Sequence, residues 1–515
     1  MSEEALRMEN ITKIYSNGFM ANKDVSLIVN KGEIHALVGE NGAGKTTLMK
    51  ILFGMENFQS GRILLDGVEE KITNPLEAIA KGIGMVHQHF MQVPSLTVAE
   101  NVTLGMEPGH ILYDKAKAIA MTQQISDKYQ LRVNAKDIVA DLGVELRQKV
   151  EILKSLVRNC KILILDEPTA VLPPQETKEL FAQLKLLKED GISIIFISHK
   201  LEEVVQLCDR ITVLRAGRTI GSDDVRNLTP AKISRMMVGR DVVLAIDKEE
   251  PVTKQTVLEI KNVRHRNQDR VQVVNGVSFK LRAGEILGIA GVEGNGQNEI
   301  AELVSGLIPL NHGDIILNGM SIRGKTIRQI RDKGMAYISA DRMKYGCAPQ
   351  LSIRENIMAD RIHDQKYRKW RIFLDTRKIN DEVDRLIKEF EVSCDNRIQP
   401  IRMLSGGNIQ KVIVAREFTS GANLIVANQP TRGIDVGTAE MIRKTLVHKT
   451  RKENIAALLV SSDLNEVLEV SDRLLVMKDG KVVAHFRRAH DVTDELLGEY
   501  MLGIRRMTEE EMGEY

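Results

Sequence analysis

A glycine-rich stretch at residues 39–46, GENGAGKT, has the spacing of a loop that binds phosphate. An apolar run precedes it and the helical pattern TTLMKILF follows, which is the context that this motif requires. Backbone N–H groups and the start of the helix would hold a polyphosphate, Lys45 would reach its β- and γ-phosphates, and Thr46 would bind Mg²⁺. A glycine-rich structural turn is the alternative, and the flanking segments disfavour it. The candidate nucleotide-binding residues here are Gly39, Asn41, Gly42, Ala43, Gly44, Lys45, Thr46 and Thr47.

Four further polar residues follow apolar runs in the first half of the chain. Asp166 and Glu167 follow ILIL, Gln88 stands in MVHQHF, and His199 stands in FISHK. Asp166 could help to hold Mg²⁺, and Glu167 could orient an attacking water. A structural cap or a structural histidine would explain each residue taken alone. Together with the phosphate loop they favour catalysis, with Gln88, Glu167 and His199 as the catalytic residues.

Strands must bring these residues together. Apolar runs at 34–38, 162–165 and 192–197 predict buried strands, and helical stretches such as PQETKELFAQLKLLKED lie between the runs. Strands that alternate with helices predict an α/β fold with a mostly parallel sheet, which binds ligands at the carboxyl ends of its strands. The motifs fall at those ends.

The chain repeats itself. VSLIVNKGEIHALVGENGAGKTT is matched by VSFKLRAGEILGIAGVEGNGQNE, which pairs Lys45 with Gln297, 252 positions later. KILILDEPTAVL is matched by NLIVANQPTRGI, which pairs Asp166 with Asn428. Repeats of this length predict two homologous domains with separate cores. We place the domains at 1–246 and 256–504, with a short polar linker at 247–255 and a charged, frayed tail at 505–515.

The composition restricts the function further. With 72 Lys plus Arg against 70 Asp plus Glu, the net charge of +2 provides no overall field for nucleic acid. Hydrophobic residues make up 43% and charged residues 28%, which is ordinary for a folded soluble protein. No run approaches the ~20 apolar residues that cross a bilayer, and the acidic start MSEEALRMEN is unlike a secretory signal. We expect neither export nor a membrane span, and four inert cysteines in a reducing cytosol.

The order of phosphate loop, Gln88, signature, DEP and His199, with LSGGN at 404–408, resembles the ATP-binding subunits of ABC transporters. Two such halves in one chain are most similar to the tandem ATPases of bacterial importers for ribose, galactose and related sugars. MVHQHFMQVPSLTVAENVTLG and GVEGNGQ resemble the branch associated with nucleoside uptake. The resemblance implies two P-loop NTPase domains, each with a RecA-like core and a helical insert. It also implies ATP and Mg²⁺ as cofactors, with Thr46, Gln88 and Asp166 as metal ligands.

The same resemblance implies partners and a location. Two transmembrane permease subunits and an extracytoplasmic substrate-binding lipoprotein would complete the transporter, and this chain would lie on the cytoplasmic face of the cell membrane. The two halves would pair head to tail within the chain, so that Ser405, Gly406 and Gly407 complete the ATP site of the first half. Tyr15 would stack on the adenine.

The second site of such a pair is degraded. The matched positions are Lys45 and Gln297, Thr46 and Asn298, Asp166 and Asn428, Glu167 and Gln429, His199 and Ser462, Gln88 and Ala340, and Tyr15 and Asn267. The signature that would face this site reads LGVEL at 142–146, with Glu145 in place of the second glycine. Neutral drift should affect both sites equally, so we expect only the first site to hydrolyse ATP.

Two other functions remain open from the sequence. Import of ribose or another simple sugar would use the same kind of subunit. A soluble tandem ATPase that acts on ribosomes or nucleic acid is the alternative from another class, but such proteins usually have two intact sites, a long charged linker and a basic surplus. We expect the basic stretch at 361–378, which contains the single tryptophan, Trp370, to be a helix that is solvated or faces the permease.

Overall fold

The chain forms two compact units, Met1–Val242 and Val243–Tyr515. The computed structural model describes residues 3–16, 18–40, 42–87, 91–109, 113–169, 172–198, 200–239, 248–251, 255–267, 270–370 and 373–513. Within these ranges, no helix has both the length and the apolar character needed to cross a membrane.

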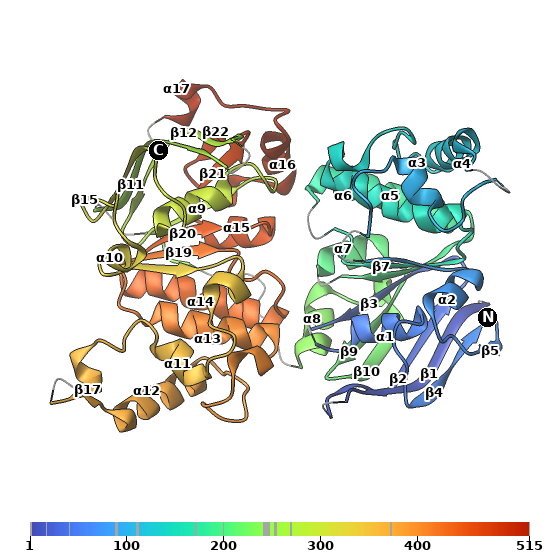
Figure 1. The fold of residues 1–515 in the computed structure, drawn as a ribbon, viewed down its shortest axis with the longest axis horizontal. Helices are drawn as coiled ribbons and strands as arrows, with labels where there is room; N and C mark the ends of the chain where they lie inside the picture. Colours follow the sequence, from blue (N-terminus) through green and yellow to red (C-terminus); the bar gives the residue numbers. More distant parts are fainter. Residues whose placement is uncertain are drawn as a thin grey trace. The chain divides into compact units, whose positions relative to one another are not determined.

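A six-stranded sheet forms the centre of the first unit (Figure 1). Its order is β6 (Ile83–Val86), β7 (Ile162–Asp166), β8 (Ser193–Ile197), β3 (Ile34–Gly39), β9 (Arg210–Arg215) and β10 (Arg218–Asp224). Neighbouring strands pair in parallel except β9 and β10. Every residue of β3, β7 and β8 is buried, as expected when both faces of a parallel sheet are covered. The predicted parallel sheet is confirmed.

An antiparallel sheet lies next to it in the first unit. Its order is β2 (Met20–Asn30), β1 (Glu4–Ile14), β4 (Ser60–Leu65) and β5 (Val68–Glu70). This sheet and α1 (Lys45–Leu52) share one hydrophobic core with β3, to which Leu37, Leu48 and Ile51 belong. Because β3 and α1 are both held by this core, the short loop that joins them has a fixed position.

The other helices of the first unit connect or cover the strands. They are α2 (Pro75–Ala80), α3 (Val98–Thr103), α4 (Lys115–Lys128), α5 (Val144–Val157), α6 (Pro174–Glu189), α7 (Leu201–Leu207) and α8 (Pro230–Val238). Of these, α3, α4 and α5 contact one another and lie between β6 and β7 in the chain. They form the helical insert that the sequence predicts.

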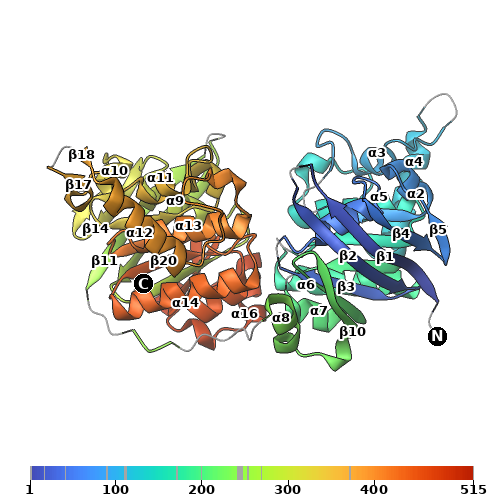
Figure 2. The same cartoon turned by 90° about the horizontal axis from the view of Figure 1, so that it is seen from below.

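The second unit, which Figures 1 and 2 draw from two sides, repeats the strand order of the first. Its larger sheet runs β16 (Met335–Ile338), β19 (Leu424–Asn428), β20 (Ala456–Val460), β13 (Ile286–Ala290), β21 (Arg473–Lys478) and β22 (Lys481–Phe486). The smaller sheet runs β12 (Gln272–Arg282), β11 (Thr256–Arg266), β14 (His312–Leu317) and β15 (Met320–Ser321). The helices are α9 (Gln297–Ser305), α10 (Ile327–Arg331), α11 (Ile353–Met358), α12 (Thr376–Glu389), α13 (Gly406–Phe418), α14 (Val436–Lys452), α15 (Leu464–Val470) and α16 (Asp494–Leu502). The duplication therefore extends to the fold.

The basic stretch at 361–378 is not the helix that we expected. A short hairpin occupies it, in which β17 (Arg368–Lys369) pairs with β18 (Phe373–Leu374), and α12 begins only at Thr376. The side chain of Asp375 accepts a hydrogen bond from the N–H of Lys378 and so starts the helix there. Trp370 follows β17 and is 86% exposed.

The tail is also better ordered than we expected. Helix α17 (Glu509–Met512) begins with a capping box formed by Thr508 and Glu511. The N–H of Met507 donates to the carbonyl of Val483 at 3.0 Å, and the His485 ring nitrogen Nδ1 lies 2.8 Å from the carbonyl oxygen of Met512. The prediction of a frayed tail is wrong for this segment because these backbone groups are bonded to β22.

Candidate functional site

Lys45 begins α1 and is almost fully buried, with 6% of its surface exposed. Its Nζ donates to the carbonyl oxygens of Gly39 at 2.7 Å and Glu40 at 3.0 Å. Burial lowers the pKa of the Lys45 ammonium, and the carboxylates of Glu167 and Asp166 partly oppose that shift. The ammonium group is thus held inside the loop by two carbonyls, which phosphate oxygens could replace.

The loop before Lys45 has a backbone shape that requires glycine. Gly44 has a φ of 96°, and a Cβ at this position would overlap the carbonyl oxygen of Ala21. The sequence analysis missed Asn22, a fully buried residue of β2 whose Nδ2 donates to the carbonyl of Gly44 at 3.1 Å. Asn22 could have been found in the sequence as a polar side chain on the buried face of an apolar strand. Of the predicted loop residues, Gly39, Gly42, Ala43, Gly44, Lys45, Thr46 and Thr47 lie in or next to this turn, and Asn41 lies outside the described residues.

Asp166 ends β7 and lies beside the first turn of α1. The Oγ1 of Thr46 donates to the Oδ2 of Asp166 at 3.3 Å. Burial raises the pKa of Asp166, as does the neighbouring Glu167, whereas the Thr46 hydrogen bond and Lys45 lower it. A hydroxyl and a carboxylate are the oxygen ligands that a hard divalent cation prefers. Over the described part of the chain, no cluster of three His, Cys, Asp or Glu side chains could hold a metal without further ligands.

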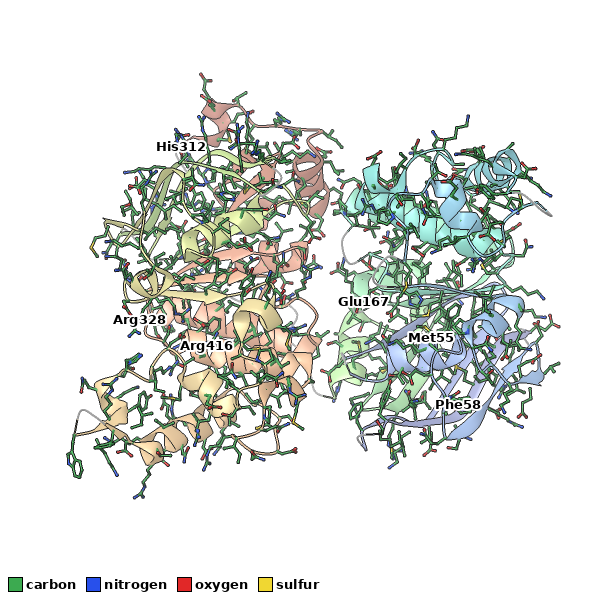
Figure 3. All side chains as sticks on the ribbon, in the orientation of Figure 1. Met55, Phe58, Glu167, His312, Arg328 and Arg416 are labelled. Atoms are coloured by element: carbon green, nitrogen blue, oxygen red, sulfur yellow. The ribbon has the colours of Figure 1, made fainter. Side chains whose placement is uncertain are left out.

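Glu167 follows directly after β7 with a left-handed backbone (Figure 3). Its φ is 51°, and its N–H donates to the carbonyl of Ile197 at 3.0 Å, at the end of β8. This bond ties the Asp–Glu turn to the strand that precedes His199. His199 itself and Gln88, which follows β6, lie outside the described residues, so their predicted positions are not tested.

Tyr15 lies next to the start of α1. Its hydroxyl is 3.5 Å from the Oγ1 of Thr47, and the Nζ of Lys13 lies 5.0 Å from the centre of its ring. The ring of Phe19 is stacked with it at 6.4 Å between centroids. An aromatic surface therefore stands beside the phosphate loop, where an adenine could stack on it.

The second unit keeps the shape of the phosphate loop and lacks its charge. Gly296 has a φ of 100° and precedes α9, as Gly44 with a φ of 96° precedes α1. The Nε2 of Gln297 donates to the carbonyls of Gly291 at 3.3 Å and Val292 at 3.0 Å, as Lys45 does to its own loop. The amide can reproduce these contacts, but it brings no positive charge.

The residues that replace the acid and the histidine are bonded to each other. Gln429 has the same left-handed backbone as Glu167, with a φ of 53°. Its Oε1 accepts hydrogen bonds from the N–H of Ser462 at 3.0 Å and from the Ser462 hydroxyl at 2.9 Å. Asn428 takes the place of Asp166 and is 1% exposed. The second unit therefore carries neutral groups at each of these positions.

The two signature segments also differ. Ser405 caps α13 by accepting a hydrogen bond from the backbone N–H of Asn408 at 3.4 Å, and the Nδ2 of Asn408 donates to the same hydroxyl at 2.9 Å. Gly406 and Gly407 form the first turn. In the first unit, Gly143 caps α5 without a side-chain hydrogen bond, and Glu145 is paired with Lys149. The intact signature thus belongs to the unit with the neutral phosphate loop.

A buried lysine in a glycine loop, a hydroxyl beside a strand-end aspartate, and a glutamate next to it define an ATP-hydrolysing P-loop protein. The LSGGN helix start narrows the class to ABC-type ATPases, and the comparisons with known proteins agree. The sequence matches the family described as ABC transporter over residues 22–170 and 274–432. This chain belongs to the ABC transporter family.

Proteins that are similar to this chain over nearly its full length are named as ATP-binding proteins for import. The guanosine import ATP-binding protein NupO of Bacillus subtilis is 41% identical, over 97% of this chain and 98% of that protein. The nucleoside import ATP-binding protein NupA of Lactococcus lactis subsp. cremoris is 41% identical, over 93% and 95%. The glucose import ATP-binding protein TsgD13 of Haloferax volcanii is 40% identical, over 97% and 96%.

One solved structure has a similar fold over nearly the whole chain. It is the archaeal ribosome recycling factor aABCE1 in complex with the ribosomal stalk protein aP1, which is 19% identical with a TM-score of 0.60. The match covers 93% of this chain and 90% of that one. At this identity the likeness concerns the fold alone.

Proposed function

We propose that this chain is the ATP-hydrolysing subunit of a membrane importer for nucleosides. Two of the similar proteins are named for guanosine and nucleoside import, at 41% identity. Import of a simple sugar is the second candidate, because a relative named for glucose import is 40% identical. The substrate contacts of such a transporter lie in other subunits, so a transport assay must decide between them.

The observation that carries the proposal is the asymmetry between the two phosphate loops. The first unit holds Lys45 at its loop and Asp166 beside Thr46, whereas the second holds Gln297 and Asn428 in equivalent places. In the ATP-bound state the two units pair within the chain, and Ser405, Gly406 and Gly407 then complete the site of the first unit. The second site does not hydrolyse ATP.

Thr46, Asp166 and Gln88 are suited to hold Mg²⁺ together with the phosphates of ATP. When bound, the ion neutralises charge on the phosphates during transfer. Lys45 exchanges its two carbonyl partners for phosphate oxygens, and Glu167 orients the attacking water. His199 stabilises the γ-phosphate from the neighbouring strand end.

The partners of the subunit are two permease subunits and an extracytoplasmic substrate-binding lipoprotein, with the chain on the cytoplasmic face of the membrane. A cavity of about 200 Å³, lined in part by β6 and α5, is large enough for one or two side chains of a permease subunit. Its lining includes Phe53, Met85, His87, Met91, Glu151 and Arg158. Aromatic residues, methionine and arginine, which are enriched at protein interfaces, are among these side chains.

Glu167→Gln in the transporter complex is the test. We expect steady-state hydrolysis to fall by at least about 100-fold, because the group that orients the water is lost. Gln429→Ala, the matched change in the second unit, should leave the rate unchanged. Substantial hydrolysis by Glu167→Gln would mean that the second site is active. Uptake of labelled nucleosides and ribose by a deletion strain, with and without the gene, would identify the substrate.

A soluble ATPase that acts on ribosomes or RNA is the remaining alternative. The net charge of +2 provides little attraction to nucleic acid. A salt-sensitive association of the purified chain with RNA would support that alternative and contradict the importer.

A further inference from the structure

The second unit has extra residues between its sheet and its helical insert. Eleven residues separate β6 from α3 in the first unit, and fourteen separate β16 from α11 in the second. In this longer segment Arg342–Gly346 form a π-helical turn. The side chain of Asp341 accepts hydrogen bonds from the N–H groups of Met343 at 3.1 Å and Lys344 at 3.0 Å, which fixes the start of the turn.

Arg342, the first residue of this turn, connects three segments. Its Nη1 donates to the carbonyl of Gly406 at 3.2 Å, in the first turn of the signature helix α13. Its Nη2 donates to the carbonyl of Gly433 at 3.3 Å, in the loop between β19 and α14. The planar guanidinium can hold two carbonyls at once in a fixed geometry, which a lysine ammonium does less well.

The guanidinium lies close to the backbone of both glycines. A Cβ on Gly406 would lie 3.4 Å from the guanidinium, at ordinary van der Waals contact. A Cβ on Gly433 would lie 3.1 Å from Nη2, and the φ of +65° at Gly433 is one that a side chain rarely adopts. The guanidinium is therefore packed directly on the backbone of the signature.

The start of α13 lies near the cations Arg342 and Arg432. It also lies near the carboxylate of Asp435, whose Oδ2 lies beside Gly407. Burial lowers the pKa of Arg342, and the nearby cation Arg432 lowers it further, but an arginine stays protonated at neutral pH. Arg432 lies 4.0 Å from the carboxylate of Glu293, so that pair is weak. The start of a helix also carries partial positive charge. An anion such as a γ-phosphate would therefore meet charges of both signs at this end.

The same segment also holds the far end of α13. The Nη2 of Arg416 donates to the carbonyl of Gly346 at 2.7 Å (Arg416 is labelled in Figure 3). Glu417, fully buried, accepts a hydrogen bond from the N–H of Tyr337 at 3.2 Å. The segment from β16 to the π-helical turn thus contacts both ends of the signature helix.

We propose that Arg342 is a positioning residue for ATP hydrolysis: it holds the first turn of α13 where Ser405 and Gly407 meet the γ-phosphate of the ATP bound by the first unit. This inference rests on the proposed function, in which the signature of the second unit completes that site. It makes the segment between β16 and α11, in which Ala340 is matched to Gln88, a mechanical link between the helical insert and hydrolysis.

The test compares Arg342→Gln, Arg342→Lys and the control Lys344→Gln in the transporter complex. Lys344 lies in the same turn with an exposed side chain, next to the ring of Tyr345. We expect kcat for ATP to fall about 10- to 100-fold in Arg342→Gln, because misplacing a group by about 1 Å costs that much. The Kd for ADP should not change, because ADP has no γ-phosphate to meet the signature. Arg342→Lys should recover part of kcat.

A purely structural role would lower kcat and the affinity for ADP together. Wild-type kcat in Arg342→Gln, or a loss of ADP affinity as large as the loss of kcat, would overturn the assignment. If thermal melting shows that Arg342→Gln is unfolded, the same comparison is made with Arg342→Lys. A wild-type complex without any hydrolysis would refute the proposed function itself, whereas normal wild-type hydrolysis with an unaffected Arg342→Gln would refute this inference alone.

Discussion

Lys45→Gln would give the first phosphate loop the side chain that the second loop already carries. Gln297 shows that an amide fits: its Nε2 donates to two loop carbonyls at 3.3 and 3.0 Å, where the Nζ of Lys45 donates at 2.7 and 3.0 Å. Both loops end in a left-handed glycine, Gly44 or Gly296. The variant should therefore fold with an unchanged loop.

The expected loss in affinity follows from the charge alone. A hydrogen bond from a charged donor contributes about 1.5–3 kcal/mol, so replacing Lys45 should weaken ATP binding by about 10- to 150-fold. Two effects on the fold oppose each other: the variant removes an ammonium that burial disfavours, and it leaves an amide oxygen without a partner, as the Oε1 of Gln297 is among the described residues. We expect the thermal midpoint without nucleotide to change little.

Binding is best measured with a fluorescent ATP analogue in the Glu167→Gln background, where turnover does not interfere. Gln297→Lys is the matched control, since it restores the lysine to the second loop and should add nucleotide affinity there. ATP binding by Lys45→Gln as tight as that of its parent would refute the reasoning, because the loop charge would then contribute nothing.

Two predictions concern stability. Burial and the neighbouring Glu145 raise the pKa of Glu176 to about 7, so the folded first unit keeps a proton that the unfolded chain releases near pH 4.5. The thermal midpoint of the first unit should therefore fall as the pH rises from 4.5 to about 7. Glu176→Gln should make this fall smaller. Midpoints of the variant and the wild type that fall equally with pH would contradict the prediction. Glu417→Gln should lower the free energy of unfolding of the second unit by about 3–5 kcal/mol in urea, because Arg331 and Arg416 lose their buried partner. A loss below about 1 kcal/mol would mean that the exposed Asp360 compensates.

The central sheet could be predicted because its signal is local. The apolar runs at 34–38, 162–165 and 192–197 coincide with β3, β7 and β8 to within a residue at each end. A buried parallel strand needs apolar side chains on both faces, and that requirement appears directly in the sequence. The phosphate loop is local in the same way, since its glycines and lysine are consecutive.

The missed features depend on distant partners. Arg342 bonds to Gly406 and Gly433, which are 64 and 91 residues further along the chain. No periodic pattern in the sequence predicts these contacts, and Arg342 cannot be told from a solvated arginine there. The hairpin at 368–374 was mistaken for a helix for a related reason: Tyr367, 3% exposed, anchors it in the core, and that burial is not visible in a run of charged residues.

The second unit keeps the backbone of a phosphate loop because its signature needs the same core. Helix α13 presents Ser405 only if it packs on an intact sheet, and that sheet includes β13, which leads into the loop. The charged side chains of the phosphate site are not needed for this packing. In the first unit burial and Glu167 disfavour the ionised form of Asp166, a cost that ATP and its ion can offset. Replacing this pair with Asn428 and Gln429 removes the repulsion, and the bond from Ser462 satisfies the Gln429 side chain, but the buried amide of Asn428 has no such partner among the described residues.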